Sequence, residues 1–261
     1  MIIELILLLV AGWGAGVVTG LIGASAVAVV IPILVVFGGY DPYTAIAVAL
    51  SIDIFASSMA AYNYTTHGNI DIRHGLQIAI SSVTGALIGS WISSYIPSTS
   101  LGGGSGLITL SIGLVFFLKP STLDGKIMKD YDIIKVLKKS RVIPGIMIGL
   151  VIGMIAGIVG AGGGMMILIA LVMVLDYPIH KAIGTSVLIM IFTAFSGAVG
   201  HAYYGELPFY AVIFGGIGGI VGAQSASKFA NITSEKRLKR IVGIVFMALG
   251  LMLAVFKLVL T

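Results

Sequence analysis

"GIVGAGGGMMI" occupies residues 157–167 and lies within a long apolar run. Each glycine inside a helix costs roughly 1 kcal/mol relative to alanine, so this cluster predicts an interruption where a membrane helix would otherwise be regular. A second stretch, "GLIGASAVA" at residues 20–28, occupies the matching place in the first half of the chain. The sequence therefore predicts two broken apolar segments, over residues 2–37 and 142–175.

The composition is that of an integral membrane protein. The chain has 261 residues, of which 58% are hydrophobic and 10% are charged, whereas a soluble domain carries about 25% charged residues. Its apolar stretches suit helices that cross a hydrocarbon core about 30 Å thick, and the alternating strands of a membrane barrel are absent. The chain contains no cysteine, which excludes disulfides and thiolate chemistry. The fold class predicted is an all-α polytopic membrane protein.

The second half of the chain repeats the first. Gly12 matches Gly149, an offset of 137 residues, and the same offset aligns further residues without a gap. These include Gly16 with Gly153, Gly20 with Gly157, Gly23 with Gly160, Tyr40 with Tyr177, and Gly85 with Gly222. Glycines in register over a whole half are a stronger signal than matched apolar residues. We interpret residues 1–118 and 142–261 as two repeats joined by a linker at 119–141.

Each repeat is predicted to hold one broken segment followed by three membrane helices. The helices are expected at 44–64, 72–95 and 101–118, and then at 181–203, 208–228 and 241–258. Residues 119–141 and 228–240 are both basic, so both are expected in the cytoplasm. The broken segment between them must then cross an even number of times, as a re-entrant hairpin or as two short spans. This makes the repeats inverted and places both termini outside the cell.

Two inverted hairpins would bring their breaks together near the middle of the membrane. The second limbs would begin near Ser25 and Gly162, and each helix N-terminus offers unpaired N–H groups and a partial positive charge. Such a site binds an anion without a buried lysine. The candidate substrate-binding residues at the breaks are Gly23, Ala24, Ser25, Gly160, Ala161, Gly162, Gly163 and Gly164. In contrast, the four-residue spacing of Gly12, Gly16 and Gly20, and of Gly149, Gly153 and Gly157, favours close helix packing.

Several polar residues in the apolar spans have two interpretations. Asp53 is a candidate for proton coupling, because an intramembrane carboxylate is costly, or it is a protonated residue bonded to a nearby hydroxyl. His201 near a helix end is a pH-sensing candidate or a structural residue. Thr185, Ser186 and Gln224 could donate to an anion, or bond their own backbone and neighbouring helices.

The two glycine segments, together with "TAIAVALS" at 44–51 and "KAIGTSVL" at 181–188, resemble the sulfite exporter TauE/SafE family of transporters. The likeness covers nearly the whole chain. It implies a transporter of small anions, chiefly sulfur oxyanions and organosulfonates, in the cytoplasmic membrane. The first half departs from the glycine-rich pattern with Ala24, Ser25, Ala26 and Val27, so the two halves of the site are not expected to be identical.

We therefore expect a secondary transporter that works by alternating access. The alternatives are a passive anion channel and an intramembrane enzyme, the latter disfavoured because Asp53 is the one acid deep in a span. No cofactor, metal or nucleic acid is expected, since the four histidines lack ligand spacing. The expected partners are a small anion and the lipid bilayer, and a homo-oligomer is compatible with this fold.

Overall fold

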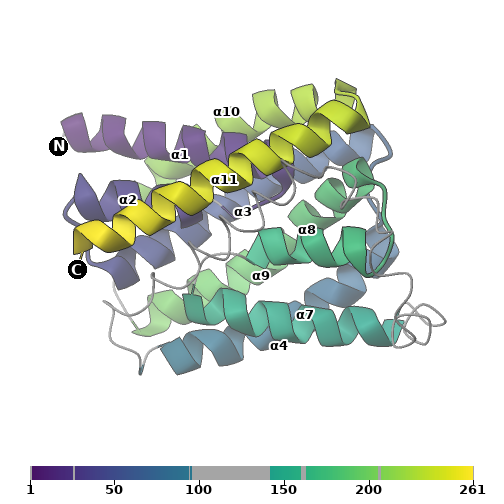
Figure 1. Cartoon of the computed structure of the whole chain (residues 1–261). Helices are drawn as coiled ribbons and strands as arrows, with labels where there is room; N and C mark the ends of the chain where they lie inside the picture. The colour runs from purple at the N-terminus through teal and green to yellow at the C-terminus, as the bar shows by residue number, and fades with distance from the viewer. Residues whose placement is uncertain are drawn as a thin grey trace.

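A computed structural model describes residues 2–25, 27–93, 95, 142–159, 163–204 and 207–260. Over these ranges the chain forms nine helices and no strand (Figure 1). The first half holds α1 (Ile2–Ile22), α2 (Val27–Val36), α3 (Pro42–Thr66) and α4 (Ile72–Ser93). The second half holds α7 (Val142–Val159), α8 (Gly163–Met173), α9 (Ile179–Tyr204), α10 (Phe209–Ile232) and α11 (Glu235–Leu260).

Five of the described helices are long and apolar enough to cross a membrane: α1, α3, α4, α9 and α10. The second limbs α2 and α8 are too short to span it, with 10 and 11 residues, because a span needs about 20 residues at 1.5 Å each. The prediction of an all-helical polytopic membrane protein is confirmed at this level.

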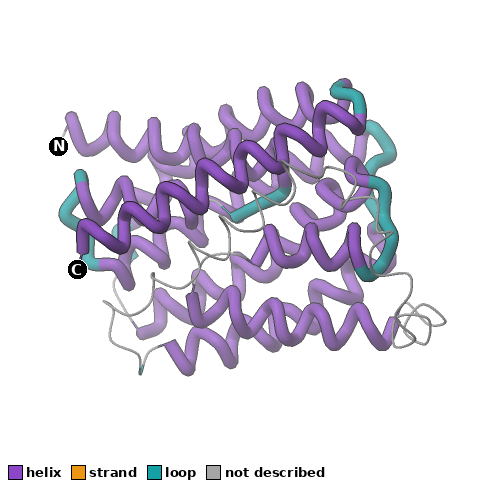
Figure 2. Tube along the Cα trace, viewed as in Figure 1, coloured by secondary structure: helices purple, strands orange, loops and turns teal. Residues whose placement is uncertain are grey.

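The first predicted interruption is present, and the second falls between two described helices. α1 ends at Ile22 and α2 begins at Val27, and the loop between them lies midway along the bundle, whereas the other described loops lie at its ends (Figure 2). Gly23 has a φ of +64°, a left-handed conformation that glycine adopts without penalty, and its N–H donates to Thr19 O at 2.9 Å. In the second half α7 ends at Val159 and α8 begins at Gly163. Gly160, Ala161 and Gly162 lie outside the described residues.

Small residues allow the helices of opposite halves to pack closely. α1 packs along α10, and α7 packs along α4. A methyl group added at Gly16 would lie 2.7 Å from Ala223 N and closer still to Gly219 O. One added at Gly153 would lie 2.7 Å from Ser82 Cα. The packing role expected of the glycines spaced by four residues is confirmed.

These contacts recur at the offset of the sequence repeat. Gly16 contacts Gly219, and their matches Gly153 and Ser82 contact each other. Gly222 contacts Trp13 and Val17 on α1, while its match Gly85 contacts Leu150 and Met154 on α7. The numbers rise together along both pairs, so α1 is parallel to α10 and α7 is parallel to α4.

The centre of the bundle is formed by α3 against α9. Gly197 lies against Leu50, whereas Gly184 lies against Tyr64 and Asn69. The residue numbers therefore run in opposite directions, and these two matched helices are antiparallel. α3 and α9 are also the most completely buried of the five long helices, which places their polar residues in the interior.

Helix boundaries differ from the predictions at the polar ends. α11 begins at Glu235, six residues before the expected start at 241. Residues 235–240, five of which are charged, are good helix formers, and Ser234 O accepts the Leu238 amide at 2.9 Å. α10 ends at Ile232 instead of 228. The helix expected at 101–118 and the linker at 119–141 lie outside the described residues, so the predicted repeat boundaries stay predictions.

Candidate functional site

Asp53 lies in the middle of α3 and is 1% exposed. Its carboxylate accepts hydrogen bonds from two hydroxyls of the broken segment. Ser25 Oγ, in the loop between α1 and α2, donates to Oδ2, and Thr19 Oγ1, near the end of α1, lies 3.5 Å from Oδ1. Thr19 Oγ1 also donates to Ala24 O at 3.0 Å. Asp53 is thus linked directly to the first helix break.

A small cavity lies beside this carboxylate, between the two halves of the chain. Its volume is about 20 Å³, enough for about one water molecule. Its lining residues are Ser25, Leu50, Asp53, Ala156, Gly163, Gly164, Ile167, Met190, Thr193 and Ala194. Met190, which matches Asp53 in the repeat, faces the same cavity from α9.

The second break also reaches this cavity. Gly163 and Gly164 form the first turn of α8 and line the cavity together with Ser25. A methyl group added at Gly164 would lie 2.6 Å from Gly23 O and 3.1 Å from Ser25 N. No larger side chain fits there, because the backbones of the two breaks are in contact. The N-terminus of α8 is therefore directed toward a space shared with Ser25 and Asp53.

Three other predicted residues lie apart from one another. Ser186 on α9 contacts the first break, with its hydroxyl 3.3 Å from Gly23 O, and it also donates to Ile183 O at 2.8 Å. Thr185 Oγ1 accepts the Asp71 amide at 3.0 Å, at one end of the bundle. Gln224 Oε1 accepts from Asn63 Nδ2 at 2.9 Å, which joins α10 to α3.

His201 is fully buried near the end of α9. Its Nε2 lies 3.3 Å from Gly157 O, and its ring centroid lies 4.5 Å from that of Tyr43. Its Nδ1 has no hydrogen-bond partner among the described residues. His201, Thr185 and Gln224 are not among the described residues that line the cavity.

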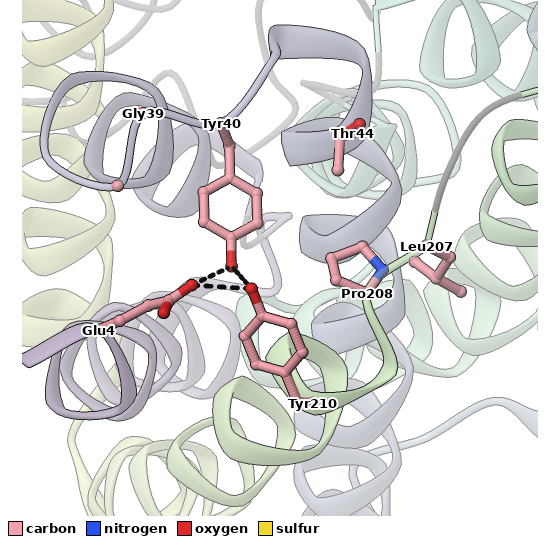
Figure 3. A pocket seen from close by; sticks show the side chains of 8 residues that line it. Glu4, Gly39, Tyr40, Thr44, Leu207, Pro208 and Tyr210 are labelled. Carbon is pink, nitrogen blue, oxygen red and sulfur yellow. Dashed lines mark hydrogen bonds between the residues drawn. The ribbon is translucent and has the colours of Figure 1, made fainter. Parts of the chain in front are cut away.

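The sequence predictions missed two polar clusters at opposite ends of α3. In the Glu4 cluster (Glu4, Tyr40 and Tyr210), the two tyrosine hydroxyls donate to Glu4 Oε1 at 3.0 and 2.7 Å and lie 2.8 Å apart (Figure 3). Burial, with the hydrogen bonds to Tyr210 and Glu4, raises the pKa of Tyr40 above its usual range. Its hydroxyl therefore stays protonated and remains a donor.

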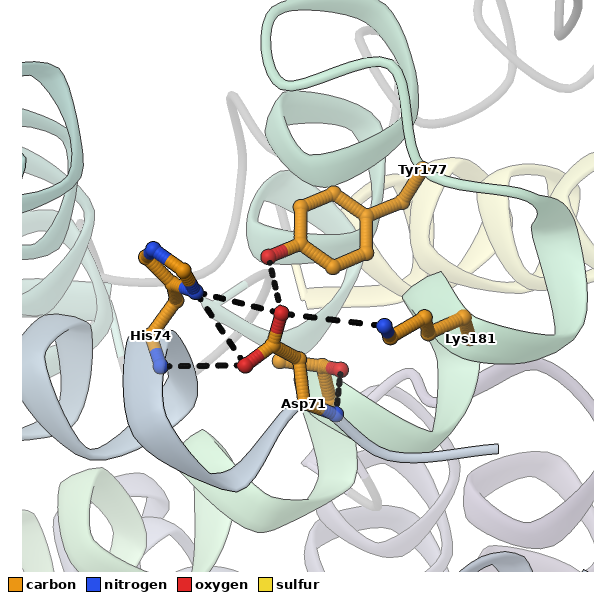
Figure 4. Close-up of polar contacts among 5 residues, drawn as sticks. Asp71, His74, Tyr177 and Lys181 are labelled. Carbon is orange, nitrogen blue, oxygen red and sulfur yellow. Dashed lines mark hydrogen bonds and ion pairs between the residues drawn. The ribbon is translucent and has the colours of Figure 1, made fainter. Parts of the chain in front are cut away.

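The Asp71 cluster comprises Asp71, His74, Tyr177 and Lys181 (Figure 4). Tyr177 donates to Asp71 Oδ2 at 2.9 Å, Lys181 Nζ lies 3.7 Å from the same oxygen, and the His74 amide donates to Oδ1 at 3.2 Å. Partial burial raises the pKa of Asp71, but the hydrogen bonds from His74 and Tyr177 outweigh it, and the pKa is lowered from its usual value. The sequence signal that could have indicated these two clusters was the match of Tyr40 with Tyr177 in the repeat.

The sequence is similar to a family of exporters and to proteins named as probable membrane transporters. A family model described as sulfite exporter TauE/SafE matches residues 8–253. Two relatives in Bacillus subtilis (strain 168) are each 26% identical: the probable membrane transporter protein YdhB, over 91% of this chain and 95% of its own, and the probable membrane transporter protein YunE, over 94% and 95%. The probable membrane transporter protein ORF9 of Sinorhizobium sp is 26% identical, over 94% of this chain and 90% of its own. No solved structure was found to match the chain.

Proposed function

Because this chain belongs to the sulfite exporter TauE/SafE family of multi-pass membrane proteins, we propose that it is a secondary transporter of small anions. The favoured substrates are sulfur oxyanions and organosulfonates such as sulfite. The observation that carries the proposal is the contact between the two helix breaks, with Gly164 against Gly23 and Ser25 beside a shared cavity.

Inverted repeats are part of the proposal. The antiparallel contact of the matched helices α3 and α9 supports them. So do the contacts of α1 with α10 and of α7 with α4, which recur at an offset of 137 residues. α1 and α3 also start at the same end of the bundle (Figure 1). The broken segment formed by α1 and α2 therefore returns to the end at which it begins. Secondary transporters commonly bind substrate where two inverted repeats meet.

The anion is proposed to bind at the N-terminus of α8, beside the Ser25 hydroxyl. The first turn of a helix offers N–H groups that lack intrahelical partners, and Gly163 and Gly164 let a ligand approach this backbone closely. A buried lysine, costly at this depth, is not required. Ser186 has a supporting role, since its hydroxyl lies 3.3 Å from Gly23 O at the first break.

Asp53 is proposed to couple anion binding to a proton. Two unit charges 4 Å apart repel by about 4 kcal/mol at an effective dielectric constant near 20, which is roughly a thousandfold in affinity. An ionised Asp53 also accepts the Ser25 hydroxyl, which then has no proton left for a substrate oxygen. Protonation of Asp53 removes the repulsion and releases Ser25, so proton and anion are expected to bind together.

The volume of the cavity favours a carrier over a channel. Room for about one water molecule is too little for an anion with several heavy atoms, so binding requires the breaks to move apart. We propose that this conformation is occluded and that substrate enters when one end of the bundle opens. The basic linker 119–141 is proposed to be cytoplasmic and both termini external, in the cell membrane.

Flux measurements in proteoliposomes test the proposal. Wild-type protein with a trapped pH dye is expected to move protons when a sulfite gradient is applied, with saturation and counterflow. Asp53→Asn is expected to abolish the proton signal. Ser25→Ala is expected to raise the KM, whereas Ser51→Ala, which loses only a 2.8 Å bond to Ala47 O on its own helix, serves as the matched control.

Each component of the proposal has its own contrary result. Unchanged proton coupling in Asp53→Asn would remove Asp53 from the mechanism. Equal effects of Ser25→Ala and Ser51→Ala would remove Ser25 from the site. Carboxylates transported in place of every sulfur anion would overturn the substrate class while leaving the carrier intact.

A further inference from the structure

Tyr40 and Tyr177 occupy equivalent turns at opposite ends of the protein. Each follows the short second limb of its half, and the two are separated by the repeat offset. The Tyr40 amide donates to Leu34 O at 3.1 Å, and the Tyr177 amide donates to Leu171 O at 3.0 Å, so the backbone turn is the same. Each hydroxyl also donates to a carboxylate, of Glu4 or Asp71 respectively.

The Asp71 cluster holds an ammonium group supplied by the chain itself. Lys181 Nζ lies 3.7 Å from Asp71 Oδ2 and 5.7 Å from the centroid of the Tyr177 ring. A carboxylate and the electron-rich face of an aromatic ring both attract an ammonium cation. At this end of the protein, the Asp71 carboxylate and the Tyr177 ring thus lie beside a primary ammonium group.

The Glu4 cluster has the same acceptors without the lysine. Thr44 stands at the position that matches Lys181, and it lines a cavity of about 440 Å³ together with Glu4, Tyr40 and Tyr210 (Figure 3). Leu207 and Pro208 form another part of the lining. Within the described part of the chain, both tyrosine hydroxyls bond to Glu4 Oε1, so Oε2 can accept from a ligand.

We propose that this cavity binds a small primary ammonium cation, whose –NH₃⁺ group takes the role that Lys181 Nζ has in the Asp71 cluster. Its donors would bond to Glu4 Oε2, with the tyrosine rings beside its charge, whereas Thr44 lines the same cavity farther from the carboxylate (Figure 3). A hard metal ion is a poorer fit, because Mg²⁺ and Ca²⁺ require six or more oxygen ligands and the lining offers one carboxylate. The carboxylate also disfavours an anion.

Direct binding to the purified full chain tests this site. Radiolabelled methylammonium is the probe, in a scintillation proximity assay at constant ionic strength with sodium as the competing cation. The wild type is expected to bind saturably, and Glu4→Gln to bind about tenfold or more weakly because a charge-assisted hydrogen bond is lost. The proposal would be overturned if sodium displaced the labelled methylammonium as effectively as unlabelled methylammonium does. Unchanged binding to Glu4→Gln would also overturn it.

Thr44→Lys provides a second test, since it reproduces the lysine of the other half. The variant is expected to lose methylammonium binding and to melt at a higher temperature than the wild type. Thr44→Met, which has a similar length and no charge, is the matched control and is expected to lack this stabilisation. Equal melting temperatures for the two variants would contradict the inference. The assay buffer contains no sulfur oxyanion or sulfonate, so its outcome is independent of the proposed transport function.

Discussion

Replacing Gly16 by alanine tests the close contact between α1 and α10. The added methyl group would lie 2.7 Å from Ala223 N and closer still to Gly219 O, whereas a carbon atom normally stays about 3.3 Å or more from such backbone atoms. Backbone cannot rotate away as a side chain can, so the two helices must separate by more than about half an ångström. Two residues earlier, a methyl group at Gly14 would meet Val29 Cγ1 at 3.4 Å, an ordinary contact.

The expected magnitudes have opposite signs. Overpacking a close contact costs about 1–3 kcal/mol, whereas glycine to alanine in an unobstructed helix gains about 1 kcal/mol. The gain applies to both variants, since both glycines lie inside α1, so Gly16→Ala is expected to be less stable than Gly14→Ala by the overpacking cost of about 1–3 kcal/mol. For a chain of this size, that corresponds to roughly 2–12 °C in melting temperature.

Thermal unfolding of both variants in the same detergent measures the difference. Gly153→Ala, the match of Gly16 in the second half, is expected to behave like Gly16→Ala because its methyl group would lie 2.7 Å from Ser82 Cα. A Gly16→Ala protein that melts at or above Gly14→Ala would refute the reasoning, since it would mean that α1 and α10 are farther apart.

Three further predictions concern single residues. Asp71→Asn is expected to destabilise the fold by about 1–3 kcal/mol at pH 7. Because the folded pKa of Asp71 is lowered from 3.8, this contribution is present above the unfolded pKa and is lost as pH falls through the folded value, so melting curves of variant and wild type should converge below about pH 4. Gly23→Ala and Gly39→Ala both introduce a side chain at positive φ, which costs roughly 1–2 kcal/mol of stability. Of these two positions only Gly23 is also crowded, so Gly23→Ala should show the lower melting temperature. Asn63→Ala removes 2.9 and 2.7 Å bonds to Gln224 and Ser227 and should cost about 1–3 kcal/mol of stability with the transport KM unchanged.

The glycine pattern was sufficient to predict where the apolar segments divide into separate helices. Gly20 and Gly23, and the four glycines within residues 160–164, predicted interrupted helices, because their cumulative cost is too high for a regular helix. Asp53 was also identifiable, since a charged residue within an apolar run is expensive and therefore informative. These signals are local in sequence, which is why they could be read without coordinates.

Contacts between distant segments could not be predicted in the same way. Thr19 looked like one more hydroxyl in an apolar helix, yet it lies beside the Asp53 carboxylate, 34 positions later. Gln224 gave no sign that its partner would be Asn63 on another helix. The Tyr40–Tyr177 match was visible in the repeat, but the carboxylates they contact come from unmatched positions, Glu4 and Asp71, so the repeat gave no sign of them.

The pairing of α1 with α10 has a consequence for biogenesis. The ribosome completes α1, which ends at Ile22, long before it makes α10, which begins at Phe209. During that interval the glycine-lined face of the first helix must rest against lipid or the insertion machinery. This contact of α1 therefore forms after its insertion, and a chain released before α10 would leave the glycine-lined face of α1 without its native partner.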